Sequence, residues 1–126
     1  MITGTCHCGA LRVEVPSKPS TITDCNCSVC RRYGTLWAYY KANTVRVVGT
    51  GKRSYSWGRK HLRFVRCGTC GCITHWEGVH PPKGARVGVN WRNFEPGLLK
   101  KVRVRQLDGA HNWKARYLNR VPHAIA

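Results

Sequence analysis

Eight cysteines constrain this chain more than any other feature, because seven of them fall into three closely spaced groups. The groups are a Cys-x-Cys at residues 6 and 8, a Cys-x-Cys-x-x-Cys at 25, 27 and 30, and a Cys-x-x-Cys at 67 and 70. The first nine residues lack the basic and apolar regions of a signal peptide, so we expect a reducing, cytoplasmic location. In that compartment, grouped cysteines are metal ligands or reactive thiols before they are disulfides.

The spacing of the thiols divides them into two different zinc sites, because zinc takes four ligands at tetrahedral corners. A Cys-x-x-Cys turn followed by Gly supplies two ligands, and a Cys-x-Cys on an extended segment places two thiols on one face. We therefore expect a closed structural site made of Cys6, Cys8, Cys67 and Cys70. The remaining thiols would hold a second zinc and leave its fourth position open, as catalytic sites do; they are Cys25, Cys27 and Cys30.

Other interpretations of the same cysteines stay open. The thiols could form disulfides, hold a single zinc with the remaining thiols free, or hold an iron–sulfur cluster. His7 and His75 lie near cysteine groups in the sequence and could replace a ligand. Cys72 has no obvious partner, and its position is more typical of a small buried residue than of a ligand.

Net charge narrows the class of partner. Lys and Arg total 22 against 5 Asp and Glu, which gives a formal charge of +17 in 126 residues. Such a balance favours anionic partners, namely nucleic acid, anionic lipid or a small polyanion, although it is also compatible with a basic surface that has no dedicated partner. No apolar stretch is long enough to span a membrane, so we expect no membrane partner.

Hydropathy alternates with a period of two along much of the chain, which is typical of half-buried strands. Apolar and polar residues alternate near 11–15, 44–47, 54–57, 86–91 and 102–105, and residues 35–41 form an aromatic-rich strand. One short helix is expected at 28–33, with Ser28 as its N-cap. We predict one all-β domain over residues 1–126, built of short antiparallel strands, with a core at about 2–118 and a frayed tail at 119–126.

The cysteine motifs together resemble those of the glutathione-dependent formaldehyde-activating enzyme family, which shares its domain with centromere protein V. The motifs are Gly-Thr-Cys-His-Cys-Gly at 4–9, Cys-Asn-Cys-Ser-Val-Cys-Arg-Arg at 25–32 and Cys-Gly-Thr-Cys-Gly at 67–71. Residues 89–94 and 107–109, together with Trp113, are also similar to the family. The resemblance implies an Mss4-like, all-β fold and two zinc ions per chain, held by the two cysteine sets given above. Cys72 departs from the family pattern, in which many relatives carry Thr or Ser.

The resemblance also implies an activity, the addition of glutathione to formaldehyde to give S-hydroxymethylglutathione, which is a carbon–sulfur lyase reaction in reverse. A thiol delivered as the fourth ligand of the three-cysteine zinc would be deprotonated and would attack the aldehyde carbon. We expect Arg31 and Arg32 to clamp the glutathione carboxylates, and Asn90 and Arg92 to position the substrate. His75 is one candidate for the general acid, and a water molecule is an equal candidate. The sequence does not identify the true thiol or aldehyde.

Two rival functions remain. The chain could be a basic zinc module that binds nucleic acid through aromatic residues interleaved with cations, namely Trp37, Tyr39, Tyr40, Tyr55 and Trp57. Against this, the same aromatics could form the core of a small β domain, and the sequence contains no basic recognition helix. Alternatively, the chain could be a non-catalytic, metal-stabilised interaction domain.

Overall fold

The computed structural model describes residues 1–119, and within that range the chain is built almost entirely of short strands. The six-residue α1 (Ser28–Tyr33) is the one α-helix among these residues, and there are three 3-10 helices, η1 (Ala42–Thr44), η2 (Trp91–Asn93) and η3 (Pro96–Leu99). The strands are β1 (Ile2–Thr5), β2 (Leu11–Val15), β3 (Thr21–Cys25), β4 (Trp37–Lys41), β5 (Arg46–Gly49), β6 (Lys52–Tyr55), β7 (Leu62–Cys67), β8 (Ile73–Gly78), β9 (Arg86–Asn90), β10 (Arg103–Leu107) and β11 (Ala115–Leu118). The all-β prediction is confirmed, and the architecture is consistent with an Mss4-like fold. Most of the tail predicted to fray, residues 120–126, lies outside the described residues.

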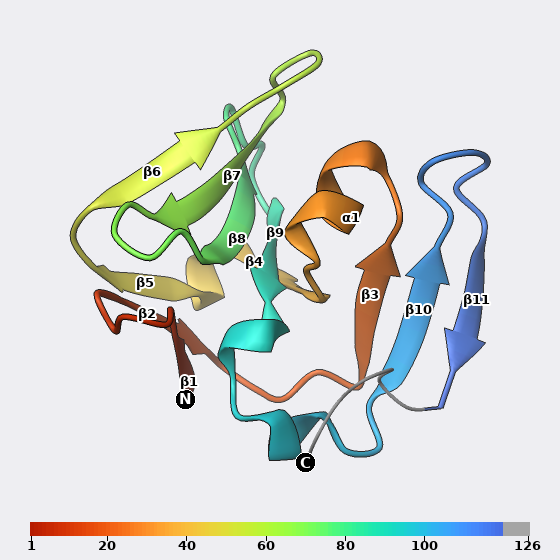
Figure 1. Ribbon diagram of the computed structural model, residues 1–126, viewed down its shortest axis with the longest axis horizontal. Helices are drawn as coiled ribbons and strands as arrows, with labels where there is room; N and C mark the ends of the chain where they lie inside the picture. The colour runs from red at the N-terminus through yellow and green to blue at the C-terminus, as the bar shows by residue number, and fades with distance from the viewer. Residues whose placement is uncertain (120–126) are drawn as a thin grey trace.

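The strands form two sheets, as Figure 1 shows. The smaller sheet has the order β1-β2-β5, and the larger has the order β11-β10-β3-β4-β9-β8-β7-β6. Neighbouring strands run antiparallel except for β3 and β10, which are parallel, so the expectation of antiparallel strands throughout is wrong at this pair. Parallel neighbours need a long connection, and here most of the chain separates the two strands, so no hairpin dictates their direction.

The apolar core follows the predicted alternation in some strands only. In β2, Leu11, Val13 and Val15 are fully buried while Arg12 is exposed, as period-two patterning requires. Strand β9 was predicted to be half-buried, but its residues from Val87 to Asn90 are all buried. The reason is that both faces of β9 are covered: Val87 and Val89 pack into the main core on one face, and Trp76 lies over Gly88 on the other.

Three local expectations need correction. The predicted strand around Tyr55 and Trp57 ends at Tyr55, the last residue of the edge strand β6, and both aromatic side chains are exposed. Trp91 does not continue β9 but begins η2, whose N-cap is the Asn90 side chain. The N-cap of α1 is Cys27 rather than Ser28: its Sγ accepts a hydrogen bond from the Cys30 N–H at 3.4 Å.

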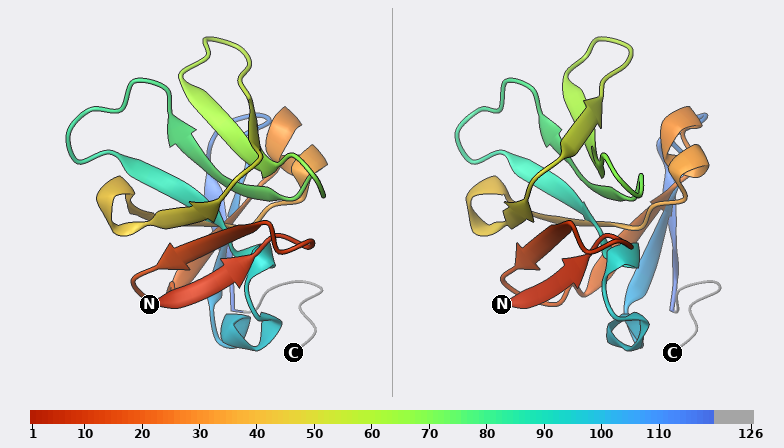
Figure 2. Two further views of the ribbon diagram at one scale, coloured as in Figure 1. Left: turned by 90° about the vertical axis from the view of Figure 1, so that its left-hand side faces the viewer. Right: turned by 60° about the vertical axis from the view of Figure 1, so that its left-hand side comes forward.

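Helix α1 lies between the two ends of the larger sheet, with β3 and β10 on one side and β7 and β8 on the other (Figure 1). The two rotated views in Figure 2 show how strongly the sheet twists. A second apolar cluster fills this space and includes Cys25, Cys30, Trp37, Phe64 and Ile73. The Tyr33 and Phe64 rings lie 5.7 Å apart and join the helix to β7. The twist therefore brings residues from both ends of the sheet around the thiols of residues 25–30. Within residues 1–119, no helix is long and apolar enough to cross a membrane.

Candidate metal centre and its cavity

Four thiols meet where the turn after β1 approaches the turn after β7. The Sγ atoms of Cys6, Cys8, Cys67 and Cys70 all lie within 4.8 Å of one another. Two tight turns bring them together, each closed by a glycine N–H that donates to a cysteine carbonyl: Gly9 to Cys6 at 3.1 Å and Gly71 to Cys67 at 3.0 Å. Both glycines have φ near +80°, a conformation that side-chain-bearing residues rarely adopt. Local turn geometry therefore presents each pair of thiols, and the fold brings the two turns together across a separation of 59 positions between Cys8 and Cys67.

Backbone N–H groups point at the sulfurs of the four-thiol cluster. The Leu11 N–H donates to Cys6 Sγ at 3.3 Å, and the Thr69 N–H donates to Cys67 Sγ at 3.3 Å. A backbone hydrogen bond from Cys72 lowers the pKa of the Cys70 thiol to about 5, and those from Cys70 and Thr69 lower the pKa of Cys67. Hydrogen bonds of this kind favour the thiolate, which is the form that binds metal.

The second set of thiols, the three-thiol cluster, comes from one continuous segment. Cys25 ends β3, Cys27 caps α1 and Cys30 lies in its first turn, and their Sγ atoms are also within 4.8 Å of one another. The Cys27 N–H donates to Cys25 Sγ at 3.5 Å, and the Trp37 indole N–H donates to Cys30 Sγ at 3.4 Å. The short helix therefore turns the third thiol back toward the first two.

The donor chemistry of both clusters fits a soft divalent cation. Burial raises the pKa of the Cys25 and Cys30 thiols, so these two resist ionisation unless a cation balances the charge. Burial also opposes ionisation of Cys27, but hydrogen bonds from the Cys30 backbone and the neighbouring thiols outweigh it and lower the pKa. All eight cysteines are free thiols. Two cysteine clusters can thus hold metal ions, one with four thiols and one with three, in the groups that the spacing predicted.

The three-thiol cluster opens onto a sizeable cavity. This cavity has a volume of about 380 Å³ and is lined by all three thiols. Its other walls come from distant parts of the chain, and most are aromatic or apolar: Val29, Trp37, Tyr39, Trp57, Gly58, Arg59, Lys60, His61, Leu62, Phe64, Trp76, Leu107 and Trp113. The four thiols of the other cluster are not among these lining residues.

The loop between β10 and β11 closes one side of the cavity. Gly109 packs so tightly on the thiols that a Cβ there would lie 2.9 Å from Cys25 Sγ. Asn26, between the first two thiols, holds this loop by donating to Asp108 Oδ1 at 3.0 Å and accepting from the Ala110 N–H at 3.0 Å. Trp113, with φ near +59°, then reaches the cavity from the same loop. Sequence reasoning missed Asn26, although its place between two ligands was a usable signal.

The four residues predicted to bind substrate are absent from the lining of this cavity, which is formed wholly within the described residues. Arg31 and Arg32 are exposed on α1, and Arg32 Nη1 donates to the Ser28 carbonyl at 2.8 Å. The Asn90 amide is buried: its oxygen accepts hydrogen bonds from the Leu36 and Arg92 N–H groups, and its nitrogen donates to the Ile73 carbonyl. The Arg92 side chain donates to the Gly34 carbonyl. The basic residues that do line the cavity are Arg59, Lys60 and His61.

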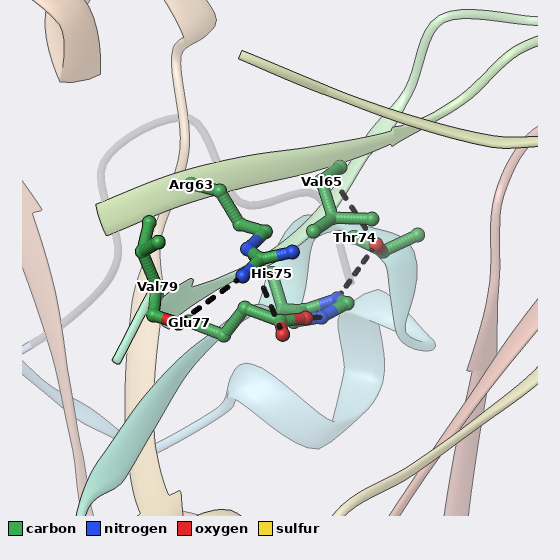
Figure 3. Close-up of polar contacts among 6 residues, drawn as sticks. All are labelled: Arg63, Val65, Thr74, His75, Glu77 and Val79. Atoms are coloured by element: carbon green, nitrogen blue, oxygen red, sulfur yellow. Dashed lines mark hydrogen bonds and ion pairs between the residues drawn. The ribbon is translucent and has the colours of Figure 1, made fainter. Parts of the chain in front are cut away.

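His75 lies on the opposite face of β8 from the cavity, so it is not positioned as a general acid there. Its neighbour Trp76 lines the cavity, and successive strand residues face opposite ways. Figure 3 shows His75 Nδ1 at 2.9 Å from Thr74 Oγ1 and Nε2 at 2.8 Å from Glu77 Oε1. Burial lowers the pKa of His75, although Glu77 partly offsets this. Neither His75 nor the exposed His7 belongs to a cysteine cluster, and Cys72 packs beside the four-thiol cluster without joining it.

Comparison with known proteins agrees with this architecture. The chain matches the family described as glutathione-dependent formaldehyde-activating enzyme over residues 1–111. The crystal structure of a Rhodobacter sphaeroides protein is similar, with 33% sequence identity and a TM-score of 0.65, and the match covers 75% of this chain and 88% of that one. The chain therefore belongs to the glutathione-dependent formaldehyde-activating enzyme family.

Proposed function

We propose that this protein adds a thiol to an aldehyde, with glutathione or a similar thiol and formaldehyde or another small aldehyde as substrates. The observation that carries the proposal is the contrast between a closed four-thiol cluster and a three-thiol cluster that faces a cavity. Membership of the family supports the same reaction class. The product would be an S-hydroxyalkyl adduct, so the enzyme would be a carbon–sulfur lyase working in the direction of synthesis.

Two zinc ions per chain belong to the proposal. Cys6, Cys8, Cys67 and Cys70 would hold the structural ion, and Cys25, Cys27 and Cys30 would hold the catalytic ion. A zinc bound there supplies a fourth position at which an incoming thiol is stabilised as thiolate near neutral pH. A cytoplasmic location is part of the proposal, because all of these thiols must stay reduced.

The protein's own residues would orient the reactants and exclude water. The Trp37 N–H bond to Cys30 Sγ fixes the third thiol against the cavity floor. One glutathione carboxylate would bind Arg59 and Lys60, which line the cavity. The other would bind Arg32, which lies in an adjoining hollow. That hollow shares Val29 and Trp57 with the cavity. Arg31 and Arg92 remain proposed outer contacts, whereas Asn90 would act by capping η2. Of the cavity-lining side chains, His61 carries the imidazole that could protonate the developing alkoxide.

The test combines metal analysis with turnover of glutathione and formaldehyde. Cys27→Ser should lose about one zinc per chain and its turnover while the fold survives. Cys70→Ser should impair folding, because a structural zinc contributes folding free energy directly. Cys72→Ser is the matched control and should keep both ions. The two-role assignment is refuted if the Cys27 and Cys70 variants lose metal and thermal stability alike, and an active-site role is refuted if Cys27→Ser turns over normally.

Binding of single-stranded nucleic acid is a second candidate, favoured by the exposure of Tyr55, Trp57 and Trp113 on a chain of charge +17. Of the other aromatics considered for this role, Trp37 and Tyr40 are less suitable because they are buried in the core, whereas Tyr39 is exposed. A salt titration of binding to short single- and double-stranded DNA decides the matter. A steep salt slope supports nucleic-acid binding, and no binding at low salt excludes it. A protein with neither activity would be a non-catalytic interaction domain.

A further inference from the structure

The cavity over the three thiols is more apolar than the reactants named so far require. Formaldehyde has one carbon and one oxygen atom, about twice the roughly 30 Å³ that a water molecule occupies in the liquid. The cavity measures about 380 Å³. Glutathione is a charged peptide, and its polar ends gain nothing from an apolar wall. The aromatic part of the cavity lining therefore has no counterpart in formaldehyde or in the charged ends of glutathione.

The aromatic walls are built into the sheet rather than left exposed by chance. Trp76 lies directly over Gly88 in the neighbouring strand, where any Cβ would overlap its indole ring. The Tyr39 and Trp76 rings are 6.0 Å apart and tilted by 56°, and the Trp37 and Phe64 rings are 6.2 Å apart. Trp37 and Phe64 are almost fully buried, so their positions are fixed by packing. They support the wall from behind, and its accessible surface belongs to the exposed Tyr39, Trp57 and Trp113 and the half-buried Trp76. Such a surface suits a flat apolar group.

The basic side chains of the cavity lining are grouped in one segment of the chain. The basic side chains that line the cavity, Arg59, Lys60 and His61, come from the single loop between β6 and β7. Among the described residues that line it, none is acidic. A charged thiol would be held by that loop, while an uncharged group would lie between the aromatic walls.

We propose that the electrophile is an apolar carbonyl compound of ring size, an aromatic aldehyde in the simplest case, rather than formaldehyde. This inference rests on the proposed function, because it names the substrate class of the same site. In the reaction, the thiol sulfur forms a bond to the carbonyl carbon, the carbon–oxygen π bond breaks, and the thiol proton ends on the oxygen. The addition needs no oxidant or reductant.

The experiment compares benzaldehyde with formaldehyde as substrates of the zinc-loaded protein in the presence of glutathione. Exchange NMR measures the rate of interconversion between free aldehyde and adduct, and the uncatalysed rate is subtracted. We expect kcat/KM for benzaldehyde to exceed that for formaldehyde at least tenfold. Trp76→Leu should lower the benzaldehyde-to-formaldehyde ratio at least fivefold. Tyr117→Leu is the control, since this exposed aromatic lies on β11 away from the cavity lining, and it should leave the ratio unchanged.

The two proposals fail in different ways. Turnover of formaldehyde with a benzaldehyde-to-formaldehyde ratio below one would overturn the inference and leave the proposed function standing. If neither aldehyde turns over, the proposed function fails. A titration with benzyl alcohol then tests the inference, with binding measured from the chemical shifts of the indole N–H groups. Millimolar binding that is lost in Trp76→Leu would support an apolar carbonyl site. Absence of binding would overturn it.

Discussion

Replacing Gly109 by Ala tests how tightly the β10–β11 loop is packed on the three-thiol cluster. A Cβ at this position would lie 2.9 Å from Cys25 Sγ, 2.9 Å from the Trp113 ring and 3.1 Å from Cys27 Cβ. Optimal carbon contacts are about 3.5–4.0 Å, so the loop or the thiols must move by more than half an ångström. Gly109 is not in the left-handed region, so the cost is steric and not a matter of backbone strain.

The expected magnitude follows from this overlap. Overpacking of a well-packed site costs about 1–3 kcal/mol, and the loss of glycine flexibility in the unfolded chain returns about 0.4–1 kcal/mol. A net loss of about 1–2 kcal/mol should lower the unfolding temperature by roughly 4–8 °C in a chain of this length. Because two of the three crowded contacts are proposed metal ligands, zinc affinity at this cluster should fall about tenfold.

The assay is thermal unfolding with and without zinc, combined with competitive zinc titration against a chromophoric chelator. Gly97→Ala in η3 is the matched control, because a Cβ there meets nothing within 4 Å and the residue is not in the left-handed region. Gly97→Ala should be neutral or slightly stabilising. The reasoning is refuted if Gly109→Ala unfolds at the same temperature as Gly97→Ala and binds two zinc ions with unchanged affinity.

Two further predictions concern groups around the site. Burial lowers the pKa of His75, so the folded state prefers the neutral ring, and stability should be lost as pH falls from about 6.5 toward the folded pKa. His75→Gln should flatten this acid slope in thermal unfolding between pH 7 and 5, and an equal slope in both proteins would contradict the assignment. Asn26→Ala removes two hydrogen bonds to the β10–β11 loop and should cost about 1 kcal/mol. It should speed amide exchange at residues 108–113, and unchanged exchange would show that Asn26 does not hold the loop.

The cysteine groups could be predicted because each motif is local, whereas the meeting of the two halves of the four-thiol cluster was inferred from the need for four ligands. A Cys-x-x-Cys turn closed by Gly71 needs only its own backbone, and the helix that carries Cys30 was placed correctly at Ser28–Tyr33. The cap assignment failed because Ser28 and Cys27 are adjacent, and a thiol is an uncommon cap. That these thiols bind zinc stays a prediction.

The cavity walls could not be predicted from the sequence, since they depend on how the larger sheet twists and in which order its strands lie. Arg31 and Arg32 were chosen because they follow the third thiol in the chain, whereas Arg59 comes to the same site from the far end of the sheet. His75 was chosen for its closeness to a cysteine in sequence. The alternation of side chains along β8 turns it away and presents Trp76 instead.

The parallel pairing of β3 with β10 has a consequence for biosynthesis. The Asn26 amide and the Asp108 carboxylate that meet beside the thiols are separated by 82 positions in the chain. A nascent polypeptide therefore presents Cys25 and its neighbours without their closing loop until the segment around Asp108 has also left the ribosome. Contacts of such long range also slow folding, because the intervening segment must first be brought back on itself. During that interval the three sulfurs are open to capture by whichever ion or oxidant arrives first.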